Sequence, residues 1–116
     1  MKNEKIFAMP LASVYPHYIK KVESKGRNQQ ELEMVIFWLT GYDAETLNKH
    51  LTNKTSFADF FALAPKMNPN VSKITGVICG YRVEEIEDPL MQKIRYLDKL
   101  VDELAKGKAL EKILRK

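Results

Sequence analysis

Residues 88–107 read DPLMQKIRYLDKLVDELAKG, and this stretch carries the strongest structural signal in the chain. Asp88 can cap a helix, because its carboxylate accepts hydrogen bonds from the free N–H groups of the first turn. Pro89 suits the first helical position, and Gly107 suits a left-handed helix stop. Between them, apolar residues alternate spacings of four and three: Leu90, Ile94, Leu97, Val101 and Leu104. The stretch therefore predicts a long amphipathic helix over residues 89–106, with this face in the core.

Caps and stops predict further helices upstream. Asn28 and Glu31 have the spacing of a capping box, and they open a helix over 29–40 that ends at Gly41. Asp43 can cap a short helix over 44–52. Thr55 or Ser56 caps the next one, where Phe57, Phe60, Phe61 and Ala64 repeat helically before Pro65 closes it. Residues 65–72, PKMNPNVS, have the composition of a loop.

The N-terminal part is predicted from its prolines. Residues up to about Ser13 are expected to be irregular, and Pro16 to start a helix that Gly26 ends. The segment 74–86, ITGVICGYRVEEI, is ambiguous, because its β-branched residues favour a strand but its apolar spacing also fits a helix. We favour the helix, since a lone strand lacks a partner. The expected fold is a mainly α, compact single-domain helical bundle of about six helices over residues 1–116. The alternative is an α+β fold with a short hairpin at 74–83.

Length and composition bound the class of protein. The chain has 116 residues, a net charge of +4 and one cysteine, Cys79, so no intramolecular disulfide is possible. Acidic and basic residues are interspersed, which is no strong nucleic-acid footprint. We find neither a signal peptide nor an apolar run long enough to span a membrane, and we therefore expect a cytoplasmic protein without membrane association.

The clearest cluster of chemically active side chains is acidic and lies at 84–88, just before the long helix. A binding or acid–base site there would use Glu84 and Glu85, with Arg82, Tyr15 and His17 brought close by the fold. In the simpler interpretation Asp88 caps the helix, Glu87 favours its N-terminus and the other acids are solvated, and we favour that interpretation.

Other candidates for chemistry are weaker. Neither His17 nor His50 has a partner at zinc spacing, and Cys79 fits a buried, inert thiol better than a nucleophile. Hence no metal, no cofactor and no catalytic constellation is identified, and whether the protein is an enzyme stays open. The segment 32–52 is similar to a helix-turn-helix, with Lys49 and His50 as contacts. Because that pattern is common by chance, we regard nucleic-acid binding only as a minor alternative.

Several stretches together resemble a known family. They are IFAMPLASVYPHYIKKVESKGR, VIFWLTGYD, FFALAPKMNPN and the run from ITGVICGYRVEEIEDPLMQ to the end of the chain. They are similar to a family of small bacterial proteins that is known only as domain of unknown function number twenty-two hundred. The resemblance implies a helical bacterial cytosolic protein and supplies no functional residues.

The sequence thus favours a non-enzymatic module that binds a protein partner or forms a homodimer. Residues 108–116 bear on this choice. They follow the stop at Gly107 and place Ala109, Leu110, Ile113 and Leu114 on one face. A helix this short needs a surface to pack on, which is either its own domain or a second subunit.

Overall fold

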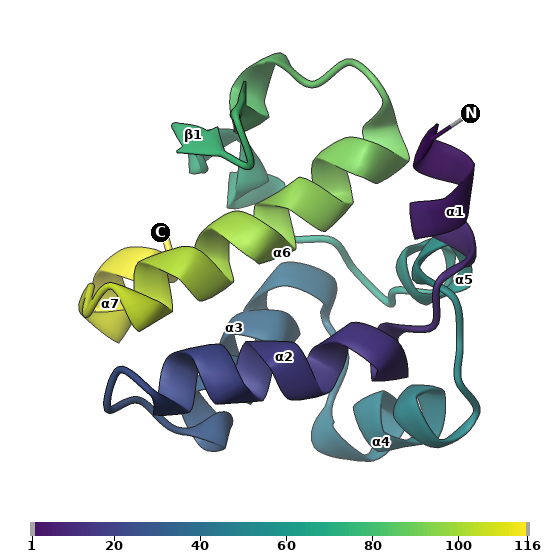
Figure 1. Cartoon of the computed structure of the whole chain (residues 1–116), viewed down its shortest axis with the longest axis horizontal. Coiled ribbons are helices and arrows are strands. Elements are labelled where there is room, and N and C mark those ends of the chain that lie inside the picture. Colours follow the sequence, from purple (N-terminus) through teal and green to yellow (C-terminus); the bar gives the residue numbers. More distant parts are fainter. Residues whose placement is uncertain (1, 116) are drawn as a thin grey trace.

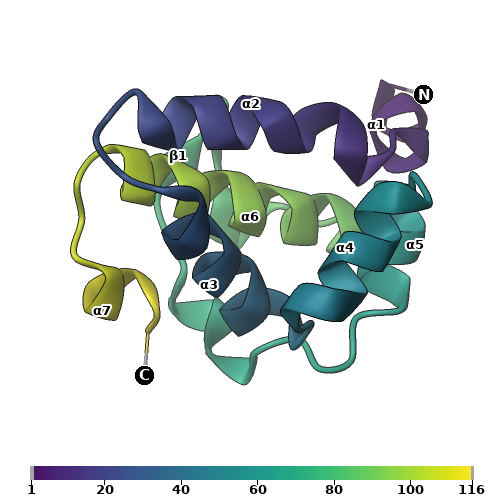
Figure 2. The ribbon, with the colours of Figure 1, turned by 90° about the horizontal axis from the view of Figure 1, so that it is seen from below.

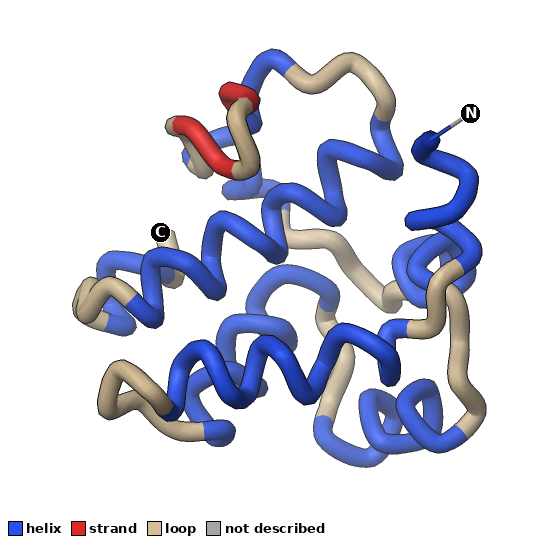
Figure 3. Tube along the Cα trace, viewed as in Figure 1, coloured by secondary structure: helices blue, strands red, loops and turns tan. Residues whose placement is uncertain are grey.

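The stretch 88–107 forms α6 (Pro89–Ala105), the helix against which most of the chain packs in a computed structural model that describes residues 2–115 (Figure 1). Before α6 come α1 (Lys2–Ala8), α2 (Leu11–Glu23), α3 (Gln29–Thr40), α4 (Ala44–Thr52), α5 (Phe57–Ala62), the 3-10 helix η1 (Pro69–Lys73), strands β1 (Val77–Ile78) and β2 (Tyr81–Arg82), and the 3-10 helix η2 (Val83–Glu85). After it comes α7 (Leu110–Ile113). Figure 3 shows helices throughout, with one small hairpin, so the predicted mainly α class is confirmed.

The core lies where α6 meets α2 and α3. Figure 2 shows α2 running alongside α6, with α3 on another side of it. The predicted stripe of α6 is buried at Ile94, Leu97, Val101 and Leu104, whereas Leu90 is only half-buried. The facing residues of α3 are fully buried: Leu32, Val35, Ile36 and Leu39. This mutual burial, more than helix propensity, fixes the position of α6.

The predicted helix ends inside the chain are confirmed at several points. Asp88 Oδ1 accepts a hydrogen bond from the Met91 N–H at 2.9 Å, as the N-cap of α6. Asn28 and Glu31 form a reciprocal capping box at the start of α3. Gly41 ends α3 with φ at 79°. Its added Cβ would lie 2.9 Å from the Lys66 backbone nitrogen, so both the turn and the close approach require glycine.

The prediction for the N-terminal residues is wrong. Residues expected to be irregular up to Ser13 form α1 and the first turn of α2, and Pro16 lies inside α2 rather than at its start. Long-range contacts hold this turn, since the Leu11 N–H donates to the Thr55 carbonyl oxygen at 2.9 Å and Leu11 is fully buried. Pro16 lies on the exposed side of α2, and its ring removes the N–H that would otherwise bond the Ala12 carbonyl oxygen four residues earlier.

The helix favoured for 74–86 is also wrong, and the alternative hairpin is present. Val77 pairs with Arg82 and Ile78 with Tyr81, in antiparallel register. The two turn residues, Cys79 and Gly80, have φ values of 53° and 85°, as a two-residue hairpin of the I′ type requires. The segment therefore supplies both strands itself. Cys79 is exposed at this turn and not buried as predicted.

The C-terminal segment packs on its own domain. Ile113 of α7 is fully buried against α6, and Leu110 and Leu114 are half-buried. Asn70 Nδ2 donates to the Arg115 carbonyl oxygen at 3.1 Å, which ties the end of α7 to η1. The face that the sequence left without a partner is therefore covered within the monomer. Lys116 lies outside the described residues.

Candidate functional site

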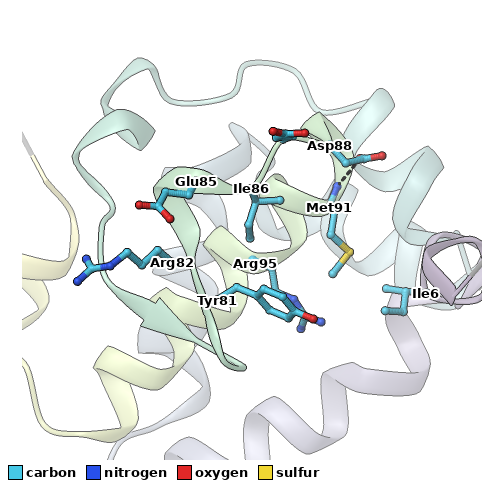
Figure 4. Close-up of a pocket in the computed structure, with 9 residues that line it drawn as sticks. Ile6, Tyr81, Arg82, Glu85, Ile86, Asp88, Met91 and Arg95 are labelled. Carbon is cyan, nitrogen blue, oxygen red and sulfur yellow. Dashed lines mark hydrogen bonds between the residues drawn. The ribbon is translucent and has the colours of Figure 1, made fainter.

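A cavity of about 680 Å³ lies between the hairpin, the N-terminal half of α6 and α1 (Figure 4). We call it the hairpin cavity. It is lined by Ile6, Tyr81, Arg82, Glu85, Ile86, Glu87, Asp88, Met91 and Arg95. Of the residues singled out from the sequence, Arg82 and Glu85 line it, together with two members of the 84–88 acidic cluster, Glu87 and Asp88.

Tyr15 and His17 lie on α2 and do not line the hairpin cavity. Tyr15 is buried, and its hydroxyl donates to Glu33 Oε2 at 3.2 Å. Burial, reinforced by the nearby Glu33 carboxylate, raises the pKa of Tyr15 to about 12. His17 is exposed. These two residues therefore belong to the packing and the surface of α2, separate from the cavity.

Glu84 does not line the cavity, and its side chain contacts residues on both strands' sides of the hairpin base. Its Oε1 accepts a hydrogen bond from the Gly76 N–H at 3.0 Å, and its Oε2 lies 3.5 Å from Arg82 Nη1. Hydrogen bonds from its own backbone N–H and from that of Gly76 lower the pKa of the Glu84 carboxyl. The Val83 N–H in turn donates to the Gly76 carbonyl oxygen at 2.9 Å. The base of the hairpin is thus closed by Gly76, Val83 and Glu84.

The interior of the hairpin cavity is apolar. Ile6 from α1, Ile86 and Met91 offer aliphatic surface, as Figure 4 shows for their side chains. Tyr81 stands at the edge, with 64% of its surface exposed, and Val77 on the paired strand is 56% exposed. A hairpin that leaves Tyr81 in water at the edge of an apolar hollow, and Val77 in water on its other face, offers surface that a bound group could cover.

The charged groups divide into an acidic edge and a basic edge. The acidic edge consists of Glu85, Glu87 and Asp88, which precede or begin α6. Within residues 2–115, Glu85 and Glu87 form no ion pair, and Asp88 is occupied as the N-cap of α6. The basic edge consists of Arg82 from β2 and Arg95 from α6. Each arginine already has a carboxylate partner outside the cavity.

Arg95 is held by a chain of polar contacts. Its Nη1 lies 2.7 Å from Asp98 Oδ2 and 3.3 Å from Cys79 Sγ. Asp98 Oδ1 accepts from the Tyr18 hydroxyl of α2 at 2.8 Å. Burial of Tyr18, followed by the charge of Asp98, raises its pKa well above the ordinary value of 10.0. These contacts connect α2, α6 and the hairpin turn, and they fix the guanidinium beside the cavity.

Sequence reasoning missed five of the residues that shape the cavity: Ile6, Tyr81, Ile86, Met91 and Arg95. For Arg95 a signal existed, because Asp98 follows at the i,i+3 spacing of a helical ion pair. Met91 lies off the main apolar stripe of α6, next to its cap. Neither Ile6 nor Tyr81 could be assigned to the cavity from the sequence. The sequence pattern predicts that Ile6 lies in an irregular N-terminal segment, and Tyr81 in a helix over residues 74–86.

The arrangement is suited to binding. It combines apolar walls with fixed charges of both signs, as ligand and peptide pockets do. Among residues 2–115, no group of three or more His, Cys, Asp or Glu side chains could hold a metal ion. None of the helices in that range has the length and apolar character needed to cross a membrane.

The helix-turn-helix-like pair, α3 and α4, presents few contacts. The ring of His50 packs against Tyr42 and Phe60, at centroid distances of 5.0 and 5.8 Å. Its Nδ1 lies 2.9 Å from Thr55 Oγ1. Lys49 is exposed and 3.7 Å from Glu45 Oε1. His50 therefore serves the packing of α4 and does not face outward as a nucleic-acid contact would.

Comparisons with known proteins give the following matches. Residues 5–115 match the model of a family described as "Uncharacterized protein conserved in bacteria (DUF2200)". A solved structure, "Crystal structure of uncharacterized protein SP1917", is 48% identical and superposes with a TM-score of 0.90, covering 96% of this chain and 91% of that chain. No curated protein matches the chain.

Proposed function

Since the chain belongs to the DUF2200 family of uncharacterized proteins conserved in bacteria, no activity comes with its relatives, and we propose that it is a non-enzymatic protein-interaction module. Its binding surface is the hairpin cavity together with the outer face of the hairpin. The cytoplasm is the proposed compartment, and the single exposed thiol of Cys79 is compatible with a reducing environment.

One observation carries this proposal: Tyr81, the most exposed apolar side chain of the hairpin, lines the apolar hollow, while Val77 is exposed on the opposite face of the same two-strand hairpin. Tyr81 and Val77 keep more than half of their surface in water, although apolar surface of this kind is costly to leave exposed. Tyrosine is also enriched where proteins bind one another, because its ring buries a large area while its hydroxyl stays hydrated. A partner that covers the cavity would bury Tyr81, and one that also extends around the hairpin would bury Val77.

A second candidate function is binding of a small ligand, with or without a reaction, at the Arg82 and 84–88 side of the cavity. The volume of about 680 Å³ favours it, because pockets for small molecules have volumes of this order. Tyr15 and His17, which the sequence associated with this function, lie elsewhere on α2. We rank this candidate second, because the exposed outer face of the hairpin has no role in it.

The proposal is tested by comparing what matched variants retain. The double variant Val77→Ser, Tyr81→Ser removes the large exposed apolar side chain from each face of the hairpin. The control Leu63→Ser removes an equally exposed side chain, 62% accessible, that follows α5. We expect a bacterial protein bound by the wild type in affinity purification to be bound by the control and lost from the double variant. Equal retention by all three proteins, or no retained protein, would overturn the proposal.

Fractionation of a bacterial extract by dialysis separates the two candidates. If a small ligand is bound, the dialysable fraction of a bacterial extract should shift the amide resonances of residues 77–95. The protein-interaction function instead predicts shifts only with the fraction that a dialysis membrane holds back.

A further inference from the structure

The acidic edge of the hairpin cavity indicates what kind of partner would fit. We infer that the partner presents a basic segment in which one large apolar side chain enters the cavity and flanking lysines or arginines meet Glu85 and Glu87. This inference rests on the proposed function and adds the chemistry of the partner to it.

The apolar part of the inference comes from the cavity walls. Ile86 and Met91 lie at its centre and Ile6 closes one end, while Tyr81 stands at the opening (Figure 4). The hollow is open to solvent on one side, so a side chain carried by another chain can enter it. An aliphatic or aromatic residue would bury its own surface together with that of Tyr81.

The basic part of the inference comes from the balance of charges. Arg82 and Arg95 each have a carboxylate partner outside the cavity, at 3.5 Å from Glu84 and 2.7 Å from Asp98. Neither arginine therefore compensates the acidic edge. Residues 84–88 contain four carboxylates and no cation in a chain whose net charge is +4. The cavity lining itself carries three carboxylates and two guanidinium groups, and the two carboxylates without an ion-pair or cap partner within residues 2–115, Glu85 and Glu87, lie at one edge, so complementary charge favours a cationic group there.

The negative charges of the acidic edge also disfavour two other occupants of the cavity. In a symmetric dimer through this surface, each acidic edge would meet either the other acidic edge, which repels it, or a basic edge whose Arg82 and Arg95 already pair with Glu84 and Asp98. Nucleic acid is polyanionic and is likewise repelled. A basic segment of another protein avoids both difficulties, which is why we commit to it.

The test uses three synthetic peptides of about 14 residues, a length at which amphipathic helices in proteins are common. One has a leucine stripe with lysine elsewhere, the second has the same stripe with glutamate elsewhere, and the third has lysine and serine without leucine. Each is titrated into the full-length protein at low salt, and amide shifts of residues 77–95 are followed by NMR. We expect only the lysine–leucine peptide to saturate at the cavity.

Matched charge variants complete the experiment. Glu85→Gln with Glu87→Gln neutralises the acidic edge, whereas Glu45→Gln with Glu111→Gln removes the same charge from exposed positions elsewhere. Two lost ion pairs at a solvent-exposed edge should weaken binding by about three- to tenfold, and the control should leave it unchanged. Raising the salt concentration should weaken the wild-type complex toward the variant.

Several results would overturn the inference. They are equal binding of the glutamate–leucine peptide, equal weakening by both double variants, and saturation by the lysine–serine peptide alone. A mass that doubles with concentration in sedimentation, with shifts confined to the hairpin, would show a second copy as occupant and overturn it too. In each case the retention experiment with Val77→Ser, Tyr81→Ser still decides separately whether the hairpin is an interaction surface.

Discussion

The two ends of α6 use charged residues in opposite ways. At the C-terminal end Glu103 is buried, and both of its carboxylate oxygens accept from the Arg115 guanidinium, at 2.9 and 2.8 Å. Arg27 donates to the Leu104 and Lys108 carbonyl oxygens at 3.2 and 2.9 Å. At the N-terminal end Glu85 and Glu87 have no ion-pair partner within residues 2–115.

The difference separates stability from binding. At the C-terminal end every buried charge has a partner, because an unpaired one would be too costly. The acidic edge near the N-terminus remains hydrated, so leaving its carboxylates unpaired costs little. A buried charge that is already paired has no free hydrogen-bonding atoms for a binding partner, whereas an exposed, unpaired carboxylate does. The stabilising network thus lies at the C-terminal end of α6, and the proposed recognition surface lies near its N-terminal end.

The largest expected effect on the free energy of unfolding comes from a substitution in the middle of α6, between the two ends. Leu97→Ala should lower the free energy of unfolding by about 2–5 kcal/mol, because Leu97 is fully buried and its truncation leaves a cavity. Urea melts followed by circular dichroism measure this. Val77→Ser, at a 56% exposed position, is the control and should change it by at most about 0.5 kcal/mol. A loss for Leu97→Ala no larger than the control's would contradict the position of the core.

The next effect compares the two ends directly with one substitution. Glu103→Gln keeps the shape of the side chain but removes the charge that Arg115 needs. We expect a loss of about 1.5–3 kcal/mol, the range for hydrogen bonds to charged groups. Glu87→Gln makes the same change at the acidic edge and should stay within about 0.5 kcal/mol. If the two variants melt alike, the distinction between a stabilising and a hydrated end is wrong.

A smaller effect appears as pH dependence at the C-terminal end. Partial burial opposes ionisation of Asp102, but hydrogen bonds from Lys106 and Lys21 outweigh it and lower its pKa below the usual 3.8. A lowered folded-state pKa adds stability above the unfolded pKa, and this stability is lost as pH falls through the folded pKa. The melting temperature of the wild type should therefore exceed that of Asp102→Asn at neutral pH. The difference between the two melting temperatures should narrow below about pH 4. If this difference in melting temperature widens in acid, the pKa of Asp102 is not lowered by folding.

The smallest effect concerns the hairpin turn. Cys79 has φ at 53° before Gly80, and Asn-Gly is the preferred pair for such a turn. Cys79→Asn should stabilise the hairpin by roughly a few tenths of a kcal/mol, without moving the global melting temperature. Slower hydrogen exchange of the Val83 amide, which closes the hairpin base, would report it. Cys79→Ser is the control. If the Val83 amide exchanges no more slowly in Cys79→Asn than in Cys79→Ser, the positive φ at residue 79 does not strain the turn.

Local signals carried much of the fold. The cap at Asp88, the capping box of Asn28 with Glu31, and the stop at Gly41 are formed by neighbours in the chain, so their spacing sufficed to predict them. For the candidate site the same holds for Arg82 and the acids at 84–88, which lie on one short segment. The predicted proximity of Tyr15 and His17 to that segment depended on how distant helices pack, and α2 places both elsewhere.

What the sequence by itself determined is the set of elements whose hydrogen bonds and apolar faces are complete over short range. These are α3, α4 and α6, together with the mainly helical class. The tertiary structure decided the rest. It stabilised the first turn of α2 through Thr55, paired Glu103 with Arg115, and brought Ile6 beside Met91 to form the hairpin cavity. Each of these depends on contacts between residues far apart in the chain, whose free energy no local pattern contains.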